Sequence, residues 1–229
     1  MARTSHFDRN TLDFLAELTM NNEKPWFEAN RKRYEQYVVE PAMAYIADMS
    51  EVVQSISRHY VAIPKKSGGS LMRVHRDTRF SREKTPYKTN IGIQFRHETG
   101  KDVHAPGFYL HIEPTECFLG AGVWHPEPDA LQHIRQRIVK KPKEWQAVIT
   151  DKGFTKFWTR EGDKLSRPPK GYDAEHPLIE DLKFKDHIAS LDFKPKDLPK
   201  MDLLSFSAER FAAAAPYMRF LCQAQGLAF

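Results

Sequence analysis

The chain has 229 residues, of which 41% are hydrophobic and 28% charged, an ordinary balance for a globular protein with a sizeable core. Its formal net charge of +5 favours anionic partners, but it is low for a protein that follows a long nucleic-acid track. No apolar run reaches membrane-spanning length and the first residues lack the apolar stretch of a signal peptide, so we expect a cytoplasmic protein without a membrane partner.

The first sixty residues predict helices. A leucine at every third position predicts a first amphipathic helix that ends at the turn of residues 21–22. Pro25 stands where a first helical position would be, and Pro41 begins a third helix that we expect to run to about residue 59. The loop of residues 64–70, rich in Lys, Gly and Ser, marks a change of structure.

From residue 71 to residue 124 the hydrophobic pattern has a period of two, which is typical of strands. We expect four strands, at residues 71–76, 90–96, 107–113 and 116–124. The last two are joined by Pro114–Thr115, a two-residue connection that predicts a tight antiparallel hairpin.

The remaining residues predict mainly helices and one possible edge strand. We expect helices at residues 128–140, 143–150 and 207–225, the last of them kinked or restarted at Pro216, and the strand at residues 187–193. The chain is thus predicted to be a single α+β domain of residues 1–229, with a mainly antiparallel sheet on which N-terminal and C-terminal helices pack. Its parts are helical residues 1–60, sheet residues 71–125 and largely helical residues 126–229.

Alternation along the strands sorts their side chains onto two different faces. One is a core face, with Met72, Val74, Ile91, Ile93, Phe95, Leu110, Ile112, Cys117, Leu119, Ala121 and Val123. The other collects Arg73, His75, Asn90, Gly92, Gln94, Tyr109, His111, Glu113, Phe118, Gly120, Gly122 and Trp124. The hairpin would place His111 opposite Phe118 and Tyr109 opposite Gly120 on this second face. Its glycines leave room, so either helices cover it in part or its side chains line a pocket, and the two are compatible.

Residues 73–88 form a basic segment that connects two predicted strands. Six cations stand there against the carboxylates of Asp77 and Glu83, and a density of guanidinium groups suits phosphate or carboxylate anions. The candidate ligand-binding cations are Arg73, Arg76, Arg79, Arg82, Lys84 and Lys88. The alternative is a solvated charged loop.

A second candidate lies at residues 21–31, where polar amides and aromatic residues meet the start of a helix, whose free N–H groups favour anions. Asn30 and Arg31, one turn further on, are candidate ligand-binding residues. The alternative is a turn followed by an amphipathic helix whose aromatic residues enter the core.

No metal ligands and no cofactor are assigned. His104, His111 and His125 with Glu113 lack a recognised metal-ligand spacing, and a straight strand would put His111 and His125 on opposite faces. Cys117 and Cys222 occupy apolar settings and are expected to be buried free thiols, although a disulfide between them remains open. Because Cys117 is expected to face the core, a nucleophilic role for it is not favoured.

Five stretches of the chain resemble a widespread family of bacterial and fungal proteins catalogued as domain of unknown function 2461. They are N-N-E-K-P-W-F-E-A-N-R-K-R-Y-E (21–35), R-V-H-R-D-T-R-F-S-R-E-K-T-P-Y-K-T-N (73–90), P-G-F-Y-L-H-I-E-P (106–114), G-A-G-V-W-H-P-E-P (120–128) and R-P-P-K-G-Y-D (167–173). The resemblance covers nearly the full length. It implies a single-domain protein and supplies no activity.

These observations favour a pocket between the glycine-containing sheet face and the N-terminal helices that binds an anionic small molecule bearing a phosphate or carboxylate. The cations of the basic segment would hold the anion, and Tyr109 and Trp124 would stack on the ligand. His75 or His111 could act as catalytic acid or base if the ligand is processed. We favour binding over catalysis.

Two alternatives come from other classes. In the first, the cations contact phosphates of a single-stranded nucleic acid while Phe80, Tyr87 or Trp124 stack on its bases. In the second, the protein is an interaction module with a solvated basic loop and no pocket. The oligomeric state stays open.

Overall fold

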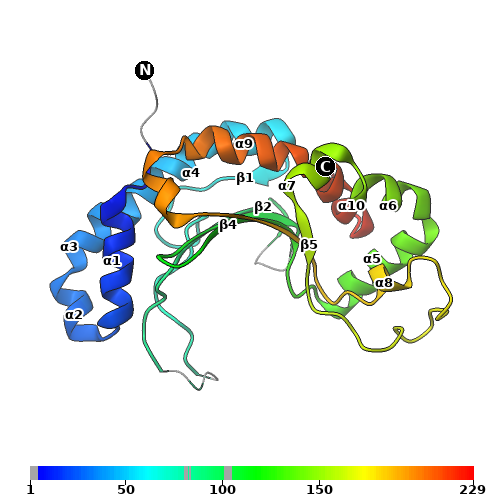
Figure 1. Ribbon diagram of the computed structural model, residues 1–229, viewed down its shortest axis with the longest axis horizontal. Coiled ribbons are helices and arrows are strands. Elements are labelled where there is room, and N and C mark those ends of the chain that lie inside the picture. The colour runs from blue at the N-terminus through cyan, green and yellow to red at the C-terminus, as the bar shows by residue number, and fades with distance from the viewer. Residues whose placement is uncertain (1–4, 80–81, 83, 101–104) are drawn as a thin grey trace.

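The computed structural model describes residues 5–79, 82, 84–100 and 105–229, and its architecture is α+β, as predicted (Figure 1). Within these residues six strands form one antiparallel sheet, in the order β1-β2-β3-β4-β6-β5. The strands are β1 (Tyr60–Val61), β2 (Ile91–His97), β3 (Gly107–Ile112), β4 (Cys117–Val123), β5 (Thr159–Glu161) and β6 (His187–Phe193).

The N-terminal helices follow the predicted order. They are α1 (Arg9–Met20), α2 (Lys24–Ala29), α3 (Arg31–Tyr34), a π-helical turn (Glu35–Val39) and α4 (Glu40–Ile56). The Asp8 carboxylate accepts a hydrogen bond from the Thr11 N–H and so caps α1. Pro25 stands in the first turn of α2, where a missing N–H costs nothing. Pro41 instead follows the π-helical turn without a break in the helix, since Val39 and Glu40 both have helical φ and ψ.

The C-terminal part is also largely helical. Its helices are α5 (Pro128–Lys140), α6 (Pro142–Ile149), α7 (Lys152–Phe157), α8 (Ile179–Leu182), a 3₁₀ helix (Pro195–Lys200), α9 (Leu203–Ala213) and α10 (Ala215–Ala224). The predicted restart of the C-terminal helix at Pro216 is confirmed. The helix α9 ends at Ala213, and Pro216 stands in the first turn of the next helix, α10. No helix among the described residues has the length and apolar character needed to cross a membrane.

The core lies between one face of the sheet and the helices α4 and α9, which Figure 1 shows above it. Phe108 on β3 packs against Phe211 of α9 with 4.7 Å between ring centroids, and both side chains are fully buried. Tyr45 of α4 donates a buried hydrogen bond of 2.8 Å to Ser207 of α9. The helices α1–α3 stand at one end of the sheet and α5, α6 and α8 at the other, so the molecule is an arch whose concave side is the opposite sheet face.

The predicted strand at residues 71–76 is wrong. Leu71 bridges to Ile93, and the Met72 N–H donates to the Gly92 carbonyl at 2.9 Å, but the chain then leaves the sheet. Beyond that point it pairs with its own returning arm, as the Lys88 N–H donates to the Val74 carbonyl at 2.7 Å. Figure 1 shows this two-armed segment descending from the sheet on the concave side.

Two further expectations need correction. Met72 was placed on the core face, but its sulfur lies 3.0 Å from where a Cβ on Gly92 would stand, on the concave face. Residues 187–193 do form a strand with the predicted bounds, yet it is not at the edge, because β5 pairs with it. The strand β5 has only three residues, too few to produce a detectable period.

Gly122 provides a direct check of the contact between β4 and β6. Its φ is +135°, and a Cβ there would lie 2.1 Å from the His187 carbonyl oxygen. We therefore expect Gly122→Ala to lower the free energy of unfolding by about 3 kcal/mol, measured by urea denaturation. Gly120→Ala is the control, because its nearest contact would be 3.4 Å from Tyr109 Cβ. Equal stability of the two variants would contradict this packing.

Candidate functional site

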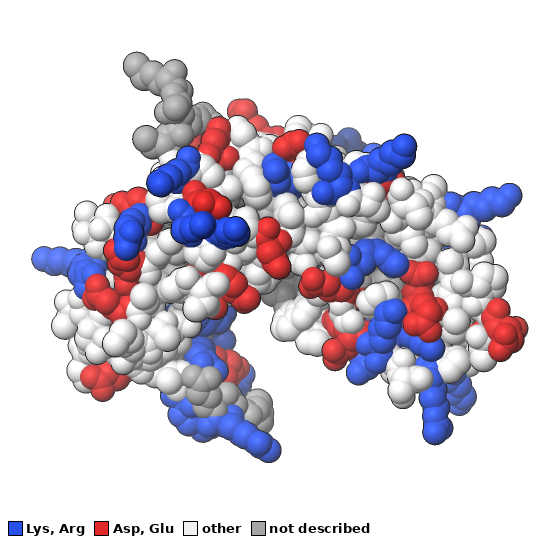
Figure 2. Space-filling view, in the orientation of Figure 1, with Lys and Arg blue, Asp and Glu red and all other residues white. Residues whose placement is uncertain are grey.

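A pocket of about 650 Å³ opens on the concave face of the sheet, a volume typical of small-molecule sites. The space-filling view shows this side of the molecule hollowed between a descending segment and the C-terminal helices (Figure 2). Three parts of the chain line it: the segment before β2, the strands β2 to β4, and β5 with β6. Its lining residues are Met72, Lys88, Asn90, Gln94, Gly107, Phe108, Tyr109, His111, Phe118, Gly120, Ala121, Gly122, Trp124, Glu161, Ile188, Ala189 and Ser190.

The register of β3 and β4 sets the pocket floor. His111 pairs with Phe118 and Tyr109 pairs with Gly120, as the two-residue hairpin predicted. The hairpin closes through a hydrogen bond of 2.9 Å from the Glu113 N–H to the Glu116 carbonyl. Because side chains alternate along each strand, Tyr109, His111, Phe118 and Gly120 all face the concave side.

The glycines of this face do different things, which corrects the expectation that all of them leave room. A Cβ on Gly92 would lie 2.7 Å from the Tyr109 hydroxyl, so the space beside Gly92 is filled by the tyrosine ring. Gly122 permits the close approach of β6 described above. Gly120 is the glycine that opens the floor, since a Cβ there would meet only Tyr109 at ordinary contact distance.

A polar network fixes the orientation of His111. The Tyr109 hydroxyl lies 3.2 Å from His111 Nδ1, and the Asn90 amide nitrogen lies 3.4 Å from the same atom. Phe118 stacks on the imidazole with 4.6 Å between centroids and 9° between planes. Burial, together with the Glu113 charge, raises the pKa of Tyr109 to about 12, so this phenol is neutral at physiological pH.

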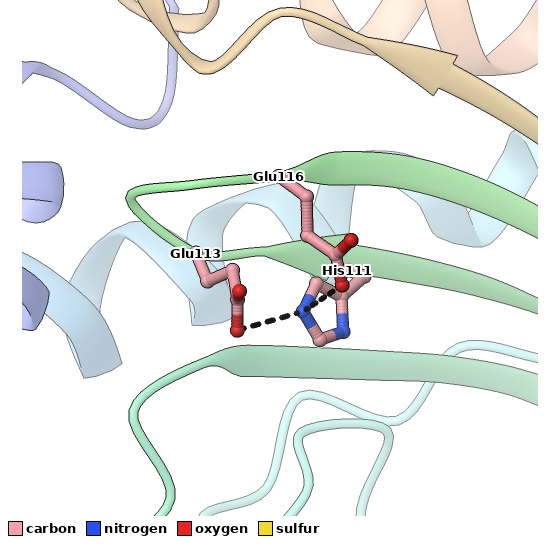
Figure 3. A group of neighbouring side chains, drawn as sticks. All are labelled: His111, Glu113 and Glu116. Carbon is pink, nitrogen blue, oxygen red and sulfur yellow. Dashed lines mark ion pairs between the residues drawn. The ribbon is translucent and has the colours of Figure 1, made fainter. Parts of the chain in front are cut away.

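The other ring nitrogen of His111 faces two carboxylates. Nε2 lies 3.4 Å from Glu113 Oε2 and 3.9 Å from Glu116 Oε1 (Figure 3). It is buried and has no hydrogen-bond partner among the described residues. His111 and Glu113 lie on the β3 side of the hairpin turn and Glu116 on the β4 side, and their ligand-type atoms all lie within 4.8 Å of one another.

Lys88 is the cation among the described lining residues. Burial, and then the charge of Arg73, lower the pKa of its half-buried ammonium. No described residue forms an ion pair or a hydrogen bond with its Nζ. The remaining lining charge is the carboxylate of Glu161 on β5, across the sheet.

The other cations of the basic segment do not line the pocket. Arg79 makes two hydrogen bonds to the Asp77 carboxylate, at 3.0 and 2.6 Å, and holds the pKa of that carboxyl well below its usual range. Lys84 Nζ donates to the Thr78 carbonyl at 2.7 Å, and Arg76 donates to the Thr85 hydroxyl at 2.9 Å.

Arg73 and Arg82 are exposed, and so is His75, whose ring centroid lies 5.2 Å from that of Tyr87. Phe80, a predicted stacking residue, lies outside the described residues, and so does His104. The structure therefore brings Lys88, Tyr109, His111 and Trp124 to one pocket and leaves His75 and the five other cations outside it.

Residues 21–31, the second candidate segment, hold the basic segment of residues 73–88 in place. The Asn22 side chain donates to the Tyr87 carbonyl at 2.9 Å and accepts from the Tyr87 N–H at 3.0 Å. Phe27 stacks on the Tyr87 ring with 4.0 Å between centroids. The turn between α1 and α2 thus holds the residue next to Lys88, which is a positioning role that the sequence did not reveal.

Asn30 and Arg31 are engaged locally. The Asn30 amide donates to the Trp26 carbonyl at 3.0 Å and its oxygen accepts from Arg33 at 3.0 Å. Arg31 makes two hydrogen bonds to Glu28, at 3.0 and 2.6 Å. Neither residue lines the pocket, and none of the helices α1–α4 contributes to it.

Several lining residues were missed from the sequence. Glu161 belongs to the short strand β5, and Ile188 and Ser190 belong to β6, which the pattern located but did not place beside β4. Phe118 was assigned to the correct face of the sheet but was not named as a ligand-binding residue. Its predicted pairing with His111 was the signal that could have identified it as one.

The sequence that forms this fold and pocket matches a known protein family. Residues 10–220 match the model of a family described as a conserved hypothetical protein, DUF2461. The chain belongs to this family. No curated protein matches the sequence. The stretches that resemble DUF2461 at residues 73–90, 106–114 and 120–128 supply Lys88, Asn90 and most of the pocket floor, whereas residues 167–173 supply no lining residue.

The two cysteines of this DUF2461 protein are free and buried, as expected. Burial raises the pKa of Cys117 to about 11 and that of Cys222 to about 11. We expect iodoacetamide at pH 8 to leave both unmodified in the folded protein and to modify both in guanidinium, because thiolate is depleted on the order of 100-fold. Mass spectrometry counts the adducts. Modification of folded Cys117 as fast as free glutathione would contradict its place on the core face.

Proposed function

We propose that this protein binds a small organic anion, with a phosphate or carboxylate at one end and a flat apolar body, in the concave pocket. The observation that supports this most is an ammonium group, that of Lys88, left without a described partner beside an aromatic pocket of about 650 Å³. A half-buried charge without a partner is costly, and an anionic ligand would remove that cost.

The anion end is defined by Lys88 and its surroundings. The positive charge of Arg73, which helps to lower the pKa of Lys88, also attracts an anion to the Lys88 end of the pocket. The amide of Asn90, two residues later in the chain, also lines the pocket and could donate to an anionic oxygen.

The body of the ligand is defined by aromatic side chains and by Gly120. Tyr109, Phe118 and Trp124 line the pocket, and Trp124 is 51% exposed, which is unusual for a tryptophan. Such rings contact planar ligands well, and the missing side chain at Gly120 leaves the floor open between them.

The opposite end of the pocket favours a ligand with one anionic end. Glu161 lies on β5, and β2 and β5 are four strand spacings apart, roughly 19 Å at the usual separation. A second phosphate near Glu161 would be repelled, whereas a hydroxyl or amine would find an acceptor there. A polyanion such as single-stranded nucleic acid is disfavoured for the same reason, and because Arg79 and Lys84 are engaged within their own segment.

A fragment screen with matched charges tests the proposal. Aromatic phosphates and carboxylates are compared with their neutral alcohols and amides by ligand-observed NMR. We expect the anionic members to bind, and Lys88→Met to weaken them by about tenfold or more, since a charge-assisted hydrogen bond is lost. The control Lys84→Met changes a cation outside the pocket and should leave affinity unchanged. Equal binding of neutral fragments, or no effect of Lys88→Met, would contradict the proposal.

A salt titration distinguishes the nucleic-acid alternative. We expect a random single-stranded oligonucleotide to bind weakly at low salt and not measurably at physiological salt, in a fluorescence anisotropy assay. Tight binding that falls steeply on a log–log plot against salt, and that survives Lys88→Met, would instead support a nucleic-acid-binding protein.

A further inference from the structure

The hairpin between β3 and β4 gathers three side chains of the kind that bind divalent metals. We propose that His111, Glu113 and Glu116 form a binding site for a first-row divalent cation such as Zn²⁺ (Figure 3). The inference goes beyond the proposed ligand and does not depend on it, because the metal alone is the probe.

The convergence of the three residues follows from the hairpin register. Glu113 and Glu116 are the pair that closes the two-residue turn, so their side chains project to the same face. His111 is two residues before Glu113 and therefore shares that face. A one-residue change in the turn would separate them.

The imidazole is held in the orientation that a metal ligand needs. Its Nδ1 lies 3.2 Å from the Tyr109 hydroxyl and its ring is stacked on Phe118, which together direct Nε2 toward the carboxylates. When Nδ1 carries the proton, it donates to the Tyr109 hydroxyl, and the Asn90 amide nitrogen is then a neighbour of Nδ1 rather than a hydrogen-bond donor to it. The Nε2 lone pair is available in this tautomer, and such an outer contact is typical of metal-bound histidines.

The distances fit a bridging cation better than a direct histidine–carboxylate pair. Nε2 lies 3.4 Å from Glu113 and 3.9 Å from Glu116, both longer than a charge-assisted hydrogen bond. In contrast, His59 and Glu98 of this same chain approach to 2.6 Å, which is within hydrogen-bonding distance. Ligand atoms around a tetrahedral Zn²⁺ with bonds near 2.1 Å lie about 3.4 Å apart. The Glu116 side chain is 62% exposed, so solvent leaves it room to change rotamer.

The donor set indicates the class of metal. One imidazole nitrogen with two carboxylates suits Zn²⁺, Mn²⁺ or Fe²⁺, whereas Mg²⁺ and Ca²⁺ prefer oxygen alone. Three protein ligands leave coordination positions for water or a ligand. Lys88, Asn90 and His111 all line the pocket, so the cation would add positive charge where the anion is expected.

Isothermal titration with Zn²⁺ alone tests this site. We expect one equivalent to bind the wild type, binding at least about tenfold weaker in Glu116→Gln and His111→Ala, and no competition from millimolar Mg²⁺ or Ca²⁺. The matched control His59→Ala removes a histidine that faces a single carboxylate and should leave the affinity unchanged.

Three results would overturn the site: no saturable Zn²⁺ binding by the wild type, full affinity in Glu116→Gln and His111→Ala, or loss of affinity in His59→Ala. Circular dichroism checks folding, and if His111→Ala is unfolded, the exposed Glu116→Gln decides. Lys88→Met should bind Zn²⁺ normally, so failure of the anion proposal and failure of the metal proposal are distinguishable.

Discussion

The register of the β3–β4 hairpin is the constraint on which the rest of the site depends. Its two-residue turn pairs Ile112 with Cys117 and Leu110 with Leu119, which sends these buried side chains to the helix-covered face. A slip of one residue would expose them and bury Tyr109 and His111 instead, at a cost of several kcal/mol for the apolar side chains alone. The same register makes the concave face: Gly120 lies opposite Tyr109, the His111 and Phe118 rings stack, and Glu113 and Glu116 meet at the turn.

The basic segment of residues 73–88 contributes one described lining residue, Lys88, to the pocket. Its two arms pair with each other, and the returning arm is fixed at Tyr87 by the Asn22 amide and the Phe27 ring. That attachment delivers Lys88 to the pocket from a segment that otherwise leaves the sheet. The proposed metal would change the charge that the proposed anion meets in the pocket. Without a metal cation, the negative charges of Glu113 and Glu116 repel an anion on this side of the pocket. With the proposed cation bound, the two carboxylates and the cation neutralise one another, and His111 holds the cation beside the ligand.

Local patterns predicted the features that depend on neighbouring residues. The turn at Pro114–Thr115 and the alternation beside it gave the register and the sharing of one face by Tyr109 and His111, because both follow from a period of two. Features that depend on distant partners were not accessible. The segment 71–76 has strand-like alternation, yet its partner after Met72 is its own returning arm. The run of cations was evident in the sequence, but the pairing of Arg79 with Asp77 and of Lys84 with a backbone carbonyl was not. Of the six candidate cations, only Lys88 lines the pocket among the described residues. Glu161 was missed because a three-residue strand carries no period.

The central claim is that an anionic ligand lies on the open floor at Gly120 with its charge at Lys88. A crystal structure of the protein soaked with an aromatic phosphate tests it most directly. We predict that the ring lies over Gly120, between Trp124 and Phe118, with a phosphate oxygen about 2.8 Å from Lys88 Nζ. A phosphate bound only to the exposed arginines of the descending segment, with the pocket empty, would contradict it.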